Sequence, residues 1–98
     1  ERIVFGDDVL ISWDTLIMDC DFHKIYDERD QVINENSPVI IGNKVWIGCR
    51  CLILKGVSIP DGAVIAASST VNKTIDNPSS IIAGSPAKTV KENISWKY

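Results

Sequence analysis

The chain has 98 residues with 13 acidic and 10 basic side chains, which give a formal net charge of −3. This length fits one small domain, and an acidic balance without a basic patch argues against binding nucleic acid. No apolar run approaches the roughly 20 residues that cross a membrane, so we expect no membrane insertion. The cysteines, Cys20, Cys49 and Cys51, form no metal or disulfide pattern, which favours a cytoplasmic protein. The chain opens on Glu1, and we expect the C-terminal fragment of a longer protein.

Residues 5–22 divide into three groups of six, FGDDVL, ISWDTL and IMDCDF. Each group begins with a large apolar residue, Phe5, Ile11 or Ile17. A period of six does not match the spacing of a helix, and it is typical of short strands separated by corners. This segment therefore predicts one coil of a repetitive β structure.

The repeat breaks where the next apolar leader is due, because position 23 holds the only histidine of the chain, His23. The sixteen residues from this histidine to Pro38 include six charged ones, so they cannot stack as a coil. We expect a loop at about 23–38. Since functional side chains are often carried by loops on a rigid scaffold, the loop is the first place to look for chemistry.

From residue 41 to residue 76 the hexads run without interruption as IGNKVW, IGCRCL, ILKGVS, IPDGAV, IAASST and VNKTID. Their leading residues are aliphatic: Ile41, Ile47, Ile53, Ile59, Ile65 and Val71. Their fifth residues are mostly small or branched: Val45, Cys51, Val57, Ala63, Ser69 and Ile75. A fifth residue and the next leader lie two apart, so they point to the same face of a strand. The pattern predicts an all-β parallel solenoid with about two coils over 39–76, whose coils bury their inner faces by stacking. A small β-sandwich with accidental periodicity is the alternative fold.

The sequence resembles the hexapeptide-repeat acyltransferases in three stretches: ISWDTLIMDCDFH (11–23), SPVIIGNKVWIG (37–48) and IIAGSPAKTVK (81–91). It is most similar to the maltose and galactoside O-acetyltransferase group, and within that group to its polysaccharide-biosynthesis members. The resemblance implies one left-handed parallel β-helix domain over 1–98, with a short C-terminal tail at about 85–98. It also implies acetyl transfer from acetyl-CoA to a hydroxyl of a sugar or glycan precursor. The resemblance further implies a homotrimer with the active site between neighbouring chains.

A histidine suits this chemistry, because imidazole can take a proton from a hydroxyl group near neutral pH and a positioned base contributes about 10²–10⁴-fold. The resemblance assigns the role of general base to His23. Asp21 is the nearest candidate by sequence to orient the imidazole ring. A surface histidine without a role is the alternative.

The resemblance also implies contacts with acetyl-CoA. Trp46 would line the channel of the pantetheine arm, and the backbone at Ala66 and Ser68 would meet its amides. A second set of residues would bind the nucleotide end of the molecule. The small residues Ala83, Gly84 and Ser85 would contact the adenine, and Lys88 and Lys91 would face the phosphates. Alternatively, the tryptophan braces the outside of the solenoid and the lysines belong to a solvated tail.

Two residues depart from the family pattern. Ala67 stands where glycine is usual, which leaves the backbone conformation of that corner open. Lys55 stands where proline is common before Gly56, so a rigid corner is lost.

Other functions are less compatible with these residues. A hexapeptide-type carbonic anhydrase needs three histidines around zinc, and one histidine cannot supply them, so we expect no metal. A non-catalytic assembly module leaves His23, Trp46 and the segment 81–91 unexplained. An N-acetyltransferase acting on an amino sugar stays open. We expect no cofactor beyond acetyl-CoA as the cosubstrate.

Overall fold

A computed structural model describes residues 2–98, and this part of the chain contains eleven strands and no helix, which confirms the all-β class. In particular, no helix among these residues is long and apolar enough to span a membrane. The strands are short and evenly spaced: β1 (Ile3–Phe5), β2 (Leu10–Ile11), β3 (Leu16–Ile17), β4 (Val39–Ile41), β5 (Trp46–Ile47), β6 (Leu52–Ile53), β7 (Ser58–Ile59), β8 (Val64–Ile65), β9 (Thr70–Val71), β10 (Ile81–Gly84) and β11 (Ala87–Lys91).

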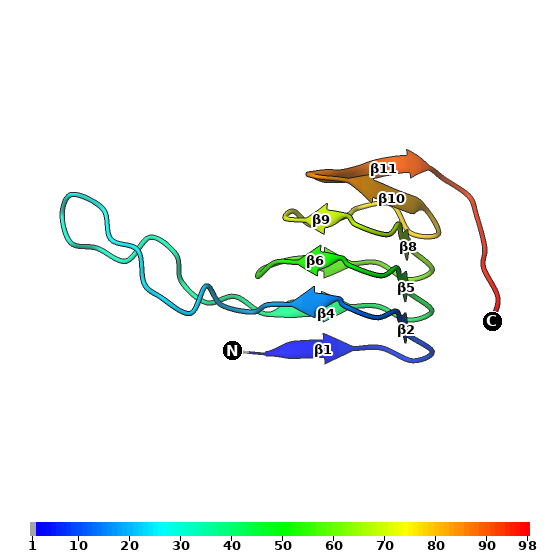
Figure 1. Ribbon diagram of the computed structural model, residues 1–98, viewed down its shortest axis with the longest axis horizontal. Helices are drawn as coiled ribbons and strands as arrows, with labels where there is room; N and C mark the ends of the chain where they lie inside the picture. The colour runs from blue at the N-terminus through cyan, green and yellow to red at the C-terminus, as the bar shows by residue number, and fades with distance from the viewer. Residues whose placement is uncertain (1) are drawn as a thin grey trace.

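Every third strand pairs in parallel, so β1, β4 and β7 form one sheet, β2, β5 and β8 a second, and β3, β6 and β9 a third. Figure 1 shows the resulting stack of layers. The register joins Ile41 to Ile59 and Ile47 to Ile65, so each coil repeats after three hexads. Between the first two coils the register joins Phe5 to Ile41, because the additional residues leave the stack as a loop.

The core fills the inside of these coils. The leaders and fifth residues of the hexads predicted to point inward are buried: Ile41, Val45, Ile47, Cys51, Ile53, Val57, Ile59, Ala63, Ile65, Ser69, Val71 and Ile75. Phe5 and Ile11 are instead 46% and 41% exposed, because β1–β3 form the last coil at their end of the described stack. Burial therefore depends on neighbouring coils, as expected for a stacked repeat.

One corner is held by a ladder of polar side chains that runs from coil to coil. The Asp7 N–H donates to Oδ1 of Asn43, and the Asn43 N–H donates to Oδ1 of Asp61, both at 2.7 Å. A Cβ on Gly42 would collide with the Asp61 carboxylate, so the corner needs a glycine there. The predicted corner residues thus satisfy backbone donors where the strands end.

Residues 18–38 leave the stack between β3 and β4 and project far beyond its edge, which gives the molecule extents of 49 × 23 × 23 Å (Figure 1). The outer part folds back on itself through an antiparallel bridge between Tyr26 and Val32. The Ile33 N–H donates to the Ile25 carbonyl at 2.8 Å. The segment therefore forms a hairpin-like arm with its own hydrogen bonds.

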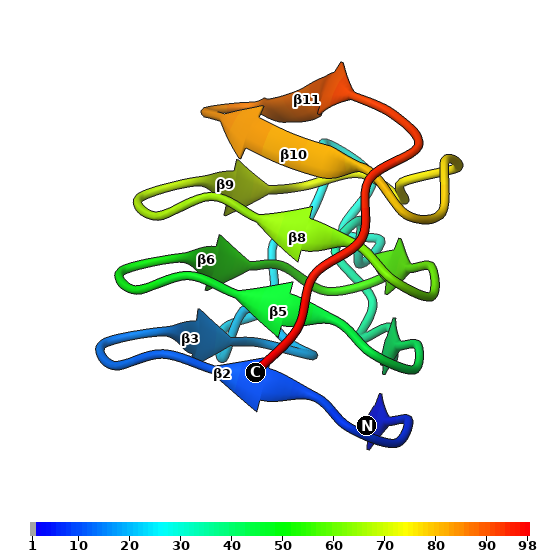
Figure 2. The same cartoon turned by 90° about the vertical axis from the view of Figure 1, so that its right-hand side faces the viewer.

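The C-terminal segment is more ordered than the expected tail at 85–98. β10 continues the second sheet in parallel beside β8, and β11 pairs antiparallel with β10. Residues 92–98 then run back across the face formed by β8, β5 and β2 (Figure 2). Hexad spacing gave no sign of this return, because the residues after 91 follow no repeat.

Candidate active site

His23 lies at the root of the projecting arm, where its exposed side chain borders a pocket. The pocket is lined by residues from both limbs of the arm: Cys20, Phe22, His23, Lys24, Asn34 and Asn36. This lining combines a base, a cation, two amides and an apolar ring. A small polar molecule with an apolar face would find partners for each of its surfaces here.

The backbone around His23 is held on both sides. Its N–H donates to the Asp21 carbonyl at 2.8 Å, and its carbonyl accepts from Nδ2 of Asn34 at 2.8 Å. Oδ1 of the same asparagine accepts from the Ile25 N–H at 2.5 Å. Phe22 adopts the left-handed region with φ of 67°, which a bulky residue occupies only where its surroundings impose it. Asn34 therefore fixes the chain on which the imidazole sits.

Asp21 was the expected partner of the imidazole, but its carboxylate binds other groups. Oδ2 forms an ion pair with Nζ of Lys55 at 2.9 Å and accepts from Nδ2 of Asn34 at 2.9 Å. The hydrogen bond from Lys55, followed by that from Asn34, lowers the pKa of Asp21 below its ordinary value. Asp21 thus connects to His23 through Asn34 and through its own backbone carbonyl.

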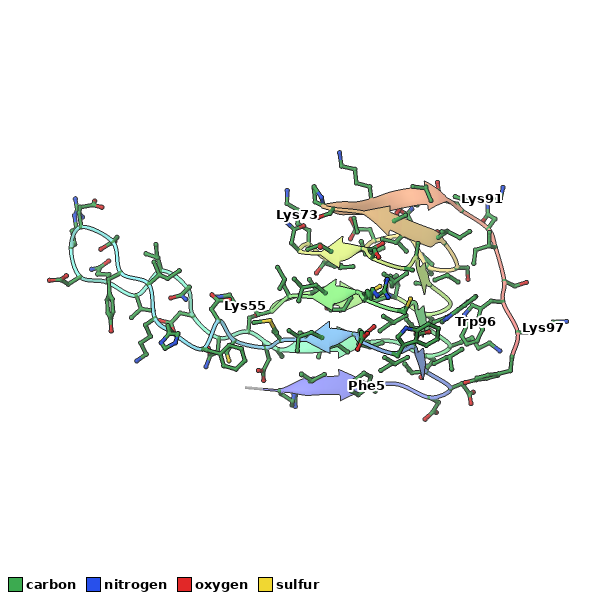
Figure 3. All side chains as sticks on the ribbon, in the orientation of Figure 1. Phe5, Lys55, Lys73, Lys91, Trp96 and Lys97 are labelled. Carbon is green, nitrogen blue, oxygen red and sulfur yellow. The ribbon has the colours of Figure 1, made fainter. Side chains whose placement is uncertain are left out.

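Trp46 lies in β5 with its ring on the outer face, 38% exposed. The ring of Trp96 packs against it with centroids 5.8 Å apart and planes inclined by 48°. Trp96 is only 9% exposed, and its indole Nε1–H donates to the Lys44 carbonyl at 2.8 Å. The end of the chain therefore covers part of the face on which the predicted pantetheine residue sits (Figures 2 and 3).

The corner after β8 carries Ala66 and Ser68. The Ala66 N–H donates to the Ile82 carbonyl at 2.8 Å, and the Ser68 N–H donates to the Cys49 carbonyl at 2.9 Å. The left-handed residue of this corner is Ser68, with φ of 61°, so the turn does not need a glycine at Ala67. A Cβ on Gly48 would lie 2.8 Å from the Ala67 nitrogen, so the two coils approach closely there.

The predicted nucleotide-binding residues lie in the β10–β11 hairpin. Ala83 pairs with Lys88 across the two strands, and the Gly84 N–H donates to Oγ of Ser69 at 3.3 Å. Ser85 lies at the turn, and the side chains of Lys88 and Lys91 are exposed on β11. The hairpin is thereby tied to the corner that carries Ser68. Trp46 lies on β5 of the same sheet, separated from β10 by β8.

The structure brings the predicted residues together in two groups rather than one. His23 and its pocket lie on the arm, whereas Trp46 belongs to the sheet β2–β5–β8 at the opposite side of the stack (Figures 1 and 2). Within residues 2–98, no cluster of three or more His, Cys, Asp or Glu side chains is arranged to hold a metal ion.

Comparison with known proteins identifies the family to which this chain belongs. Residues 38–73 match the family model of the bacterial transferase hexapeptide (six repeats). The chain is 43% identical over 79 residues to a probable macrolide acetyltransferase of Lysinibacillus sphaericus, covering 81% of this chain and 43% of that protein. The chain therefore belongs to the hexapeptide-repeat family, as the sequence pattern predicted.

Two solved structures extend the likeness over almost the whole chain. The polysialic acid O-acetyltransferase OatWY is 42% identical with a TM-score of 0.95, covering 98% of this chain and 46% of that one. A galactoside acetyltransferase in complex with coenzyme A is 32% identical with a TM-score of 0.79, covering 92% and 44%. The chain thus spans less than half the length of these relatives.

Sequence reasoning missed three residues that shape these regions, namely Asn34, Lys55 and Trp96. Lys55 stands where the family commonly has proline, and this difference was visible in the sequence. It indicated only that a rigid corner is lost, and not that the lysine contacts the arm. A large apolar ring among the charged residues near the end of the chain was the signal for Trp96. Asn34 gave no signal, because its partners depend on how the arm folds back.

Proposed function

We propose that the protein is an acetyl-CoA-dependent O-acetyltransferase that acetylates a hydroxyl of a sugar or glycan precursor, built on a left-handed parallel β-helix. The observation that carries this proposal is His23, held through its backbone at the edge of a polar pocket on the arm. The likeness to a polysialic acid O-acetyltransferase over 98% of the chain supports the same chemistry. It also supports the handedness of the coils.

In the proposed reaction, the imidazole of His23 takes the proton of the acceptor hydroxyl as its oxygen attacks the thioester carbon of acetyl-CoA. The carbon–sulfur bond breaks and the acetyl group stays on the acceptor oxygen. The sulfur leaves as a thiolate that takes the proton from the His23 imidazolium, which gives coenzyme A and regenerates the base. Because the thioester is already activated, the main task of the protein is to deprotonate and align the acceptor. Lys24 and Asn36 line the pocket and would orient the acceptor through hydrogen bonds.

Acetyl-CoA would bind along the second sheet. Trp46 supplies a flat apolar wall for the pantetheine arm. The N–H groups of Ala66 and Ser68 are already bonded within the stack, so their carbonyl oxygens would accept from the pantetheine amides. Ala83, Gly84 and Ser85 leave room for the adenine, and the exposed Lys88 and Lys91 face its phosphates. The galactoside acetyltransferase solved with coenzyme A supports a CoA substrate for this fold.

The separation of His23 from Trp46 within one chain supports a site shared between chains. In a homotrimer, the arm of one chain would reach the second sheet of its neighbour and bring the imidazole to the thioester. The exposed apolar side chains of the arm, Phe22, Ile25, Tyr26 and Ile33, would then be covered by that neighbour.

The proposed function is tested by incubating the protein with acetyl-labelled acetyl-CoA and a panel of sugars, amino sugars and one macrolide. We expect a labelled sugar ester, which mild base hydrolyses. A base-stable amide as the sole product would refute O-transfer, and a macrolide ester as the sole product would refute the sugar acceptor.

A further inference from the structure

We infer that Lys55 is a positioning residue for the proposed base, because its ammonium group closes the root of the arm on which His23 sits. This inference rests on the proposed function of His23 and adds a residue that acts through others.

Lys55 follows β6 at a corner of the second coil and reaches both limbs of the arm. Its Nζ lies 2.9 Å from Oδ2 of Asp21 on the outgoing limb and donates to the Glu35 carbonyl at 2.7 Å on the returning limb. The lysine side chain of the ion pair is 22% exposed, and the Asp21 side chain, 37% exposed, faces water. Figure 3 shows Lys55 where the arm joins the stack. One cation thereby ties two limbs to the rigid coil.

The contact is transmitted to His23 through side chains. The Asp21 carboxylate that pairs with Lys55 also accepts from Asn34 Nδ2, and the same nitrogen donates to the His23 carbonyl. Lys55 therefore fixes the position of Asp21, Asp21 fixes the asparagine, and the asparagine fixes the backbone of the base. Such a support determines where a catalytic group sits without touching the substrate.

Backbone hydrogen bonds still join the arm to the stack when Lys55 is replaced. The Ser37 N–H donates to the Asp19 carbonyl at 3.1 Å, and the Gly56 N–H donates to the Pro38 carbonyl at 3.1 Å. Replacing Lys55 should consequently loosen the root near His23 without detaching the arm or unfolding the coils.

The chain offers a matched control in Lys73, which occupies the same hexad position one coil further along (Figure 3). Lys73 is exposed, and it lies on the stack rather than at the junction with the arm (Figure 3). Lys55→Met and Lys73→Met remove the same charge from equivalent corners. Lys55→Arg keeps the charge and the ability to donate to both oxygens.

The experiment measures kcat, the affinity for coenzyme A, and the NMR resonance of His23 Hε1, identified by its loss in His23→Ala. We expect Lys55→Met to lower kcat by about 10–100-fold, as misplacement of a catalytic group does. Coenzyme A affinity should stay unchanged, and the His23 resonance should shift or broaden. Lys73→Met should behave as the wild type, and Lys55→Arg should regain most of the lost rate.

A Lys55→Met protein with the kcat and His23 resonance of Lys73→Met would overturn the inference. Equal losses of kcat and coenzyme A affinity would also overturn it, because they indicate a general structural role. The His23 resonance tests this inference separately from the proposed function, because it can be measured even if the wild type transfers no acetyl group. In that case an unchanged His23 resonance in Lys55→Met still refutes the positioning role of Lys55, and a shifted resonance supports it.

Discussion

The centroids of the indole rings of Trp46 and Trp96 lie 5.8 Å apart, although Trp46 belongs to the second coil and Trp96 lies two residues before Tyr98. Lys44 completes the contact, since its carbonyl accepts from the Trp96 indole and its Nζ lies 4.7 Å from the centre of the same ring. Aromatic and cation–π contacts of this kind contribute roughly 0.5–1.5 kcal/mol each. Together they hold residues 92–98 against the second sheet.

Trp96→Ala should release this segment, because the ring is its buried anchor. We expect faster proteolysis after residue 91 and faster hydrogen exchange of the amides at 92–98, with the coils still folded. Tyr98→Ala is the matched control, since Tyr98 is 75% exposed and should change both readings little. Unchanged proteolysis in Trp96→Ala would mean that the segment is held by other contacts.

Trp46→Ala should weaken coenzyme A binding by about 2–10-fold, the loss expected for one aromatic contact of about 0.5–1.5 kcal/mol. The rate at saturating acetyl-CoA should fall less than the affinity, because the ring is proposed to bind the pantetheine arm rather than to take part in proton transfer. Isothermal titration calorimetry measures the affinity. Trp13→Ala, at an exposed corner of the first coil, serves as the control. Equal affinities in the two variants would exclude Trp46 from the binding site.

The contacts of Asp21 lead us to expect that the stability of the fold depends on pH in the acidic range. Its pKa is lowered by the hydrogen bond from Lys55 and then by that from Asn34, so the folded state favours the carboxylate. The resulting stabilisation is present above the ordinary value of 3.8 and is lost as the pH falls through the lower folded value. The ¹³C resonance of the Asp21 carboxyl should titrate below 3.8, and Lys55→Met should move the midpoint up. Identical midpoints in the two proteins would show that the ion pair does not form in solution.

A site shared between chains predicts complementation between variants. His23→Ala and Trp46→Ala subunits, mixed in equal amounts in one trimer, should rebuild intact sites at about one interface in four. At low acetyl-CoA the mixture should exceed the mean activity of the two separate variants. A mixture that equals this mean would place His23 and Trp46 of one site in the same chain.

The coils and their core followed from the sequence because a hexad pattern specifies contacts that recur at fixed spacing. Ile47 and Ile65 are buried and in register, as their places in the hexads predicted. The loop expected at about 23–38, where His23 replaces an aliphatic residue, lies within the longer segment 18–38 that connects β3 to β4. These are local or periodic signals, and a single sequence carries them fully.

The remaining features depend on contacts without a period. Lys55 meets Asp21 across 34 positions of the sequence, and Trp96 meets Lys44 across 52. Such pairs form only after the coils have placed the arm and the final strand, so spacing could not reveal them. Asp21 illustrates this, because its neighbourhood in sequence suggested the His23 imidazole, whereas the fold brings Lys55 to its carboxylate.

The most direct test of the proposed mechanism is the kcat of His23→Ala, measured with saturating acetyl-CoA and acceptor and compared with its affinity for coenzyme A. The loss of a general base should lower kcat by about 10²–10⁴-fold, and coenzyme A affinity should stay at the wild-type value, because the cofactor's proposed contacts lie on other strands. A variant that keeps more than about a tenth of the wild-type kcat would remove His23 from the mechanism, since that loss is smaller than any expected for a base.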